Sequence, residues 1–134
     1  MFNNELVLKS IARRVFPDMG SFSPDRTARI GLWDAHLRST RDSAWLTIYL
    51  GPDLLFQIEL RGNRLKATYA LPAVMELGDG EKEYGTAWAN SRRWRVDGWD
   101  DVPRVSMEIG KFFDNIEEFL EEETKVYRIL ERAE

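Results

Sequence analysis

The stretch of sequence that decides the fold is residues 54–71, LLFQIELRGNRLKATYAL. On both sides of Gly62-Asn63, apolar and polar residues alternate with the period of two that is typical of strands with one buried and one solvated face. Glycine and asparagine tolerate the positive φ that a two-residue hairpin turn needs. The stretch therefore predicts two antiparallel strands, 54–61 and 64–71, joined by a tight turn.

Further strands are expected on both sides of this hairpin. Extended or alternating patterns predict them over residues 29–38, 44–50, 84–96 and 102–111. For the last of these ranges the alternation of Val105, Met107 and Ile109 favours a strand, although Pro103 also suits the first turn of a helix. Residues 72–77 are expected to form one short helical turn.

Helical patterns lie at the two ends of the chain. Apolar residues at helical spacing predict an N-terminal helix over residues 4–16, ended by Pro17. From Phe112 to Leu130 the apolar residues share one broad face, which predicts a long amphipathic helix with Asp114 as its N-cap. We therefore expect one α+β domain over residues 1–134, with an antiparallel meander of five to six strands between an N-terminal helix and a C-terminal helix.

The composition is that of a globular chain with a single core. Of 134 residues, 43% are hydrophobic and 31% are charged, and none is cysteine. The lack of cysteine excludes disulfides and thiol chemistry and fits a reducing compartment. There is no apolar run of the roughly 18 residues that predict a membrane span, and Glu5 and Lys9 do not suit a signal peptide. We expect a cytoplasmic protein with no membrane partner.

The charge is distributed unevenly along the chain. The net charge is −4, but residues 1–96 carry 14 basic and 11 acidic side chains, whereas residues 97–134 carry 5 basic and 12 acidic ones. The acidic cluster at the start of the predicted C-terminal helix includes Glu118, Glu121 and Glu122. These side chains are candidates for binding a basic protein, and a solvated helix face with a favourable macrodipole is the structural alternative.

The most unusual segment is residues 88–99, WANSRRWRVDGW. Arginine and tryptophan together are typical of protein interfaces and of surfaces that stack on unpaired bases. The candidate binding residues in this segment are Arg92, Arg93, Trp94, Arg95 and Trp99. Alternatively, the tryptophans pack beneath the sheet while the arginines pair with the C-terminal glutamates.

The candidate motifs for catalysis and for cofactor binding give little support to either function. The single histidine, His36, lies in a predicted strand without the geometry of a catalytic triad, and one histidine without cysteine cannot build an ordinary zinc site. The carboxylates Asp97, Asp100 and Asp101 are of the type that binds Mg²⁺, but they lack EF-hand spacing and also fit a solvated turn. We expect no cofactor, no bound metal and no catalytic residues.

These observations favour a small non-enzymatic protein-binding module: an adaptor, a chaperone-like protein or an inhibitor. The element order, length and acidity resemble those of small acidic secretion chaperones and related prokaryotic adaptors, which implies a protein partner. The alternatives are a single-stranded nucleic-acid-binding protein and a metal-dependent hydrolase that uses the three aspartates. Association of two copies into a homodimer is left open.

Overall fold

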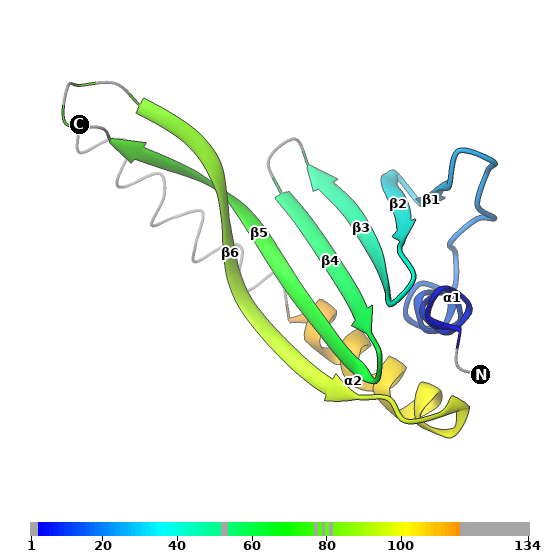
Figure 1. Ribbon diagram of the computed structural model, residues 1–134. Helices are drawn as coiled ribbons and strands as arrows, with labels where there is room; N and C mark the ends of the chain where they lie inside the picture. The colour runs from blue at the N-terminus through cyan, green and yellow to red at the C-terminus, as the bar shows by residue number, and fades with distance from the viewer. Residues whose placement is uncertain (1–2, 52–53, 77, 79, 81, 116–134) are drawn as a thin grey trace.

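The computed structural model describes residues 3–51, 54–76, 78, 80 and 82–115, of which 71–76 and 82–90 are described as backbone alone. The chain begins with helix α1, and six strands and a second helix follow (Figure 1). The bounds are α1 Asn4–Val15, β1 Thr27–Ile30, β2 Trp33–Ser39, β3 Ser43–Gly51, β4 Leu54–Arg61, β5 Arg64–Glu76, β6 Lys82–Arg95, the 3₁₀ turn η1 Trp99–Asp101 and α2 Val102–Asp114.

The strands form one antiparallel sheet in the order β1-β2-β3-β4-β5-β6, so each strand pairs with its neighbour in the sequence. The central hairpin has the predicted register, with Arg61 opposite Arg64. In its turn Gly62 takes a φ of +59°, and Asn63 is not among the residues with positive φ, a pattern typical of a type II′ turn. The predicted α+β fold with an antiparallel meander is confirmed.

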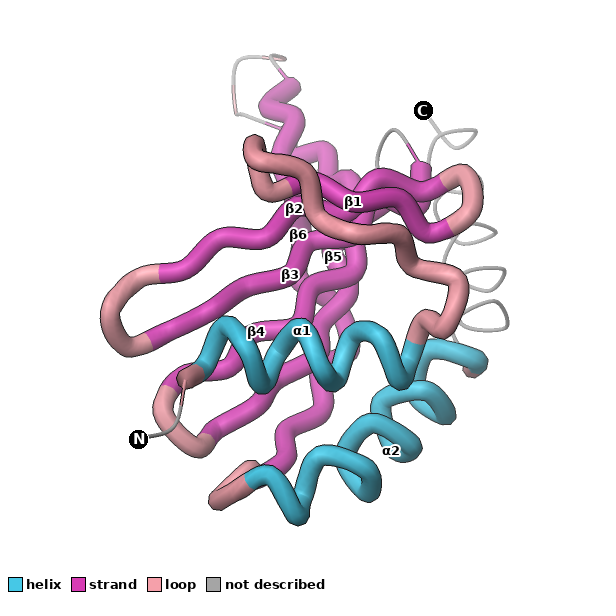
Figure 2. The backbone as a smooth tube through the Cα atoms, turned by 90° about the vertical axis from the view of Figure 1, so that its right-hand side faces the viewer, coloured by secondary structure: helices cyan, strands magenta, loops and turns pink. Residues whose placement is uncertain are grey.

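Both helices cover the same face of the sheet (Figure 2). Helix α1 packs on β3 and β4, and α2 packs beside α1. The core between the layers consists mainly of fully buried aliphatic side chains, each of which contributes about 1.5–3 kcal/mol on burial. They include Val7, Leu8, Ile11, Leu46, Ile48, Ile58, Leu60, Leu65, Val105 and Ile109.

An aromatic cluster fixes α2 against β4 and β5. The Tyr69 ring stacks on Phe112 with 5.0 Å between centroids, and Phe56 lies 5.1 Å from both Tyr69 and Phe113. The Tyr69 hydroxyl donates a hydrogen bond of 2.8 Å to the carbonyl oxygen of Phe112 in the last turn of α2. Because both ends of this contact are buried, it sets where the helix ends relative to the sheet.

The strand predicted over residues 102–111 is wrong, because this segment is helix α2. Val105, Ile109 and Phe112 are buried at spacings of four and three residues, whereas Met107 is 57% exposed. The apparent alternation thus contains one solvated position, and Pro103 lies in the first turn of the helix, where its missing N–H costs nothing. Of the long helix predicted from Phe112 to Leu130, residues 116–130 lie outside the described residues. Asp114 is the last residue of α2 and not the N-cap that the sequence predicts.

Two other local predictions also need correction. The single strand predicted over 29–38 is divided into β1 and β2 by a turn in which Gly31 has a φ of +61°. The helical turn predicted over 72–77 is wrong, because β5 continues to Glu76 and pairs with β6 there. The described part of β4 pairs with β5 only as far as Ala70. Because Pro72 lies beyond this point, its missing N–H removes no hydrogen bond to the described part of β4.

Candidate binding face

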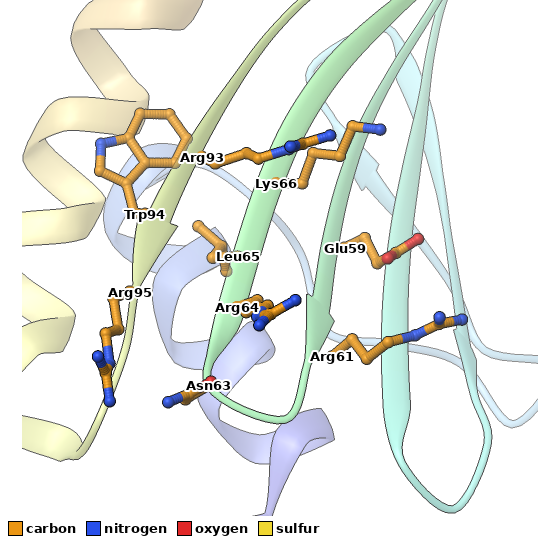
Figure 3. A pocket seen from close by; sticks show the side chains of 9 residues that line it. All are labelled: Glu59, Arg61, Asn63, Arg64, Leu65, Lys66, Arg93, Trp94 and Arg95. Atoms are coloured by element: carbon orange, nitrogen blue, oxygen red, sulfur yellow. The ribbon is translucent and has the colours of Figure 1, made fainter.

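The Arg/Trp segment predicted as one surface is divided between two faces of the sheet. Trp94 points towards the helices, where its half-buried ring lies 6.2 Å from that of Phe112 (Figure 3). Arg92 stays beside it, with its guanidinium carbon 5.8 Å from the centre of the Trp94 ring. Arg93 and Arg95 alternate with these residues along β6 and belong to the opposite face. Packing of Trp94 beneath the sheet matches the structural alternative for that residue.

Among the described residues, Trp99 does not join Arg93 and Arg95. Trp99 is 52% exposed and opens η1, after β6 has ended. Glu118, Glu121 and Glu122 lie outside the described residues. Of the predicted binding residues, the structure brings together Arg93 and Arg95 on the sheet face that the described helices leave uncovered, which we call the open face.

Three cations that the sequence prediction missed join them there. A concavity of about 710 Å³ lies over the ends of β4, β5 and β6 nearest the β4–β5 turn (Figure 3). Its charged and amide side chains are Glu59, Arg61, Asn63, Arg64, Lys66, Arg93 and Arg95. Five cations therefore surround one carboxylate among the described lining residues.

The register places several of these cations directly opposite one another. Arg61 faces Arg64, Arg64 faces Arg95, and Lys66 faces Arg93. Directly opposite residues on one face of an antiparallel pair have Cβ atoms about 4.5–5.5 Å apart, and like charges at such positions destabilise a sheet. The open face thus concentrates positive charge at a cost to the fold.

Hydrogen bonding within the described part of the chain offsets this charge only partly. Arg61 Nε donates to Ser43 Oγ at 3.1 Å, and Arg95 Nε donates to Asp97 Oδ1 at 2.9 Å. The side chains of Arg64, Lys66 and Arg93 make no hydrogen bond or ion pair with other described residues. Their charges are therefore available to an anionic ligand.

Glu59 is held by its neighbour on β3. Its Oε2 accepts a hydrogen bond of 2.6 Å from the Trp45 indole Nε1, and register places Lys66 on its other side. The indole satisfies one oxygen of this carboxylate, and no described cation lies within ion-pair distance of it. Glu59 therefore neutralises at most one of the cations beside it.

Of the three aspartates considered for a metal site, Asp97 and Asp101 form hydrogen bonds or ion pairs in the segment that follows β6. Hydrogen bonds from Arg95 and then Asn63 hold the pKa of Asp97 below its usual value. The Asp97 backbone N–H donates to Asp101 Oδ2 at 2.8 Å, and Asp101 lies 3.6 Å from Arg104. Among the residues that the structure describes, no group of three or more histidine and carboxylate side chains is arranged to hold a metal ion.

Comparison with known proteins leaves the open face as the main guide to function. No protein-family model, curated protein or solved structure matches this chain. Within the described ranges, no helix has both the length and the apolar character needed to cross a membrane. A function for this chain is therefore inferred from the chemistry of the open face.

Proposed function

We propose that the chain is a binding module that takes an acidic segment of another protein on the open face of its sheet. The observation that carries the proposal is the set of directly opposed cations, Arg61–Arg64, Arg64–Arg95 and Lys66–Arg93. Carboxylates placed between them relieve their mutual repulsion and form charge-assisted hydrogen bonds. The stability that the free protein loses at this face then contributes to affinity for an acidic partner.

The geometry of the cations supports this proposal. Arg64 and Arg93 project from paired strands, and their backbone positions are set by the ladder between β5 and β6. Guanidinium groups bind carboxylates through two parallel hydrogen bonds, which adds direction to the attraction. Because the strands are already ordered in the free chain, little backbone entropy is lost on binding.

A single-stranded nucleic acid is the alternative occupant, and two features disfavour it. Binding without sequence preference relies on exposed aromatic rings that stack on bases beside the cations. Trp94, although it lines the concavity, packs its ring against Phe112 on the helix side of the sheet, and the exposed ring of Tyr49 lies at the end of the open face away from the cations. The net charge of −4 also opposes association with a long polyanion.

The direct test is fluorescence anisotropy with a labelled peptide of alternating Glu and Ser, compared with a labelled dT12 oligonucleotide at low salt. We expect Arg64→Glu/Arg93→Glu to weaken peptide binding at least tenfold. The control is Arg13→Glu/Arg14→Glu, which makes the same change of net charge at exposed positions in α1. Equal losses in both variants, or no peptide binding by the wild-type chain, would overturn the proposal. Tighter binding of dT12 with the same dependence on Arg64 and Arg93 would identify a nucleic-acid site.

A further inference from the structure

The open face changes chemistry along the direction of its strands. On β4 the outward-facing residues between buried Phe56, Ile58 and Leu60 run in the order Leu55, Gln57, Glu59, Arg61. The series therefore passes from an aliphatic side chain through an amide and a carboxylate to a guanidinium. The apolar end is the end away from the β4–β5 turn.

The neighbouring strands extend this order into three bands across the sheet. The apolar band is Tyr49 and Leu55, which face each other in the β3–β4 register. The polar band is Thr47, Gln57, Thr68 and Ser91. The cationic band is Arg61, Arg64, Lys66, Arg93 and Arg95, the cations that line the concavity. Over β3 to β6 the open face is thus polarised, with cations at one end and an apolar pair at the other; on β2, Asp34 lies opposite Tyr49 and forms an ion pair with Arg29.

Within the apolar band, Tyr49 is accessible to solvent. Tyr49 is 41% exposed, and its ring meets His36 edge to face with centroids 4.9 Å apart. Leu55 is half-buried beside it. Partly exposed tyrosine with an aliphatic neighbour is typical of interface anchors, because the ring offers a large contact area at a low cost in conformational entropy.

The distance between the two ends limits the size of the ligand. Leu55 and Arg61 are six residues apart on one strand, which corresponds to about 20 Å at 3.3–3.4 Å per residue. About six extended residues span this distance, or about 13 residues of an α-helix. A nucleic-acid strand carries the same charge at every step and does not match a face whose charge ends partway along it.

We infer that the bound protein segment is itself polarised, with its acidic end over Arg61, Arg64 and Arg95 and its apolar end against Tyr49 and Leu55. This inference rests on the proposed function and adds the chemistry and direction of the partner. Such a segment relieves the repulsion in the cationic band and also removes the exposed surface of Tyr49 from water. An acidic segment without apolar residues satisfies only the first of these requirements.

Three labelled 14-residue peptides test the inference. The block peptide has four Glu at one end and four apolar residues at the other, the interleaved peptide has the same composition in mixed order, and the Glu-only peptide has Ser in place of the apolar residues. We expect the wild-type chain to bind the block peptide about tenfold more tightly than the other two. In Tyr49→Ser/Leu55→Ser this preference disappears, while affinity for the Glu-only peptide stays unchanged and shows that the variant is folded.

The matched control is Leu6→Ser/Met107→Ser, which removes two exposed apolar side chains from the helices, 53% and 57% exposed respectively. This variant keeps the preference for the block peptide. Equal affinity for all three peptides would overturn the inference and leave the proposed function intact. Failure of all three to bind would remove the proposed function together with the inference.

A paramagnetic label on the block peptide tests the direction of binding. Placed at the acidic end, it is expected to broaden the amide NMR signals of Gly62 and Arg64. Placed at the apolar end, it is expected to broaden those of Tyr49 and Leu55. The reverse pattern, or the same pattern from both ends, would contradict the orientation.

Discussion

Arg64 lies between two other arginines, Arg61 on β4 and Arg95 on β6, and no described side chain pairs with it. Replacing it with glutamine removes repulsion on both sides, so we expect the free energy of unfolding to stay the same or rise by less than about 0.5 kcal/mol. Affinity for the acidic peptide falls in the same variant. Urea denaturation and anisotropy measure the two effects.

Arg26 is the control for this substitution. It forms an ion pair with Glu5 of α1 and donates to Ser39 Oγ of β2, so Arg26→Gln is expected to destabilise the fold and leave peptide binding intact. Destabilisation by Arg64→Gln of the same size would show that Arg64 has a structural role instead.

Tyr69 makes the free energy of unfolding depend on pH in the alkaline range. Burial raises its pKa above the ordinary value of 10.0, so the folded chain keeps the phenol proton that the unfolded chain releases. This contribution is complete below about pH 10 and is lost as the pH rises further, with a slope of up to about 1.4 kcal/mol per pH unit. Tyr69→Phe is expected to cost about 1 kcal/mol at neutral pH, through the lost bond to Phe112, and to show a shallower decline above pH 10.

Urea midpoints of the wild-type chain and Tyr69→Phe between about pH 8 and 11 measure this difference, since other titrating groups are common to both proteins. Parallel curves would mean that the Tyr69 phenol ionises equally in the folded and unfolded chains.

Ser106 carries a buried hydroxyl within α2 that has no hydrogen-bond partner among the described atoms. Removing an unsatisfied buried polar group saves its desolvation cost, so we expect Ser106→Ala to raise the free energy of unfolding by about 1 kcal/mol. Ser10→Ala in α1, where the side chain is only half-buried, is the control for the gain in helix propensity alone. A gain no larger than that of Ser10→Ala would mean that the Ser106 hydroxyl is satisfied by water.

At the scale of elements, one glycine in a turn and one in a helix differ in what their backbone conformation requires. Gly62 has a φ of +59° in the β4–β5 turn, and Gly110 lies within α2 with nothing within 4 Å of an added Cβ. Gly62→Ala is expected to cost about 1–2 kcal/mol because alanine is strained at positive φ. Gly110→Ala is expected to stabilise by about 0.5–1 kcal/mol, since alanine loses less entropy in a helix. Thermal or urea unfolding of the two variants tests both signs, and a shift in the same direction for both would contradict this assignment.

Helix α2 also marks the limit of pattern reading at this scale. Over the seven residues from Val105 to Lys111, a period of two and a helical period share their apolar positions Val105 and Ile109. Only burial of these residues against the sheet, with Met107 left in solvent, separates the two alternatives. The turn at Gly62-Asn63, by contrast, was predicted correctly because its backbone requirement is local.

At the scale of the whole molecule, a chain with a net charge of −4 presents a cationic band on one face. Attraction of an acidic segment to exposed cations is screened by salt, with a Debye length of about 10 Å at 0.1 M and about 3 Å at 1 M. We therefore expect affinity for the Glu-only peptide to fall at least tenfold between 0.05 and 0.5 M NaCl. Affinity for the block peptide is expected to fall less steeply, because its apolar contact is not screened by salt. Equal salt dependence of the two affinities would count against that contact.

Read alone, the sequence determined the antiparallel meander, the helix before it and the apolar side of each central strand. These features depend on periodicity over a few residues, and the polar partners Arg93 and Arg95 of the cationic band were recognisable from composition. In the sequence, Arg61, Arg64 and Lys66 do not stand out as site residues, and the position of Trp94 beneath the sheet is only one of two alternatives. Which side chains become neighbours depends on the register between β4, β5 and β6. Strands β5 and β6 pair from Glu76–Lys82 to Arg64–Arg95 with a register shift between Thr68 and Tyr69, so the partner of Arg64 is not evident from the sequence. That pairing is decided by packing of the whole sheet against both helices, so the composition of the open face belongs to the tertiary structure.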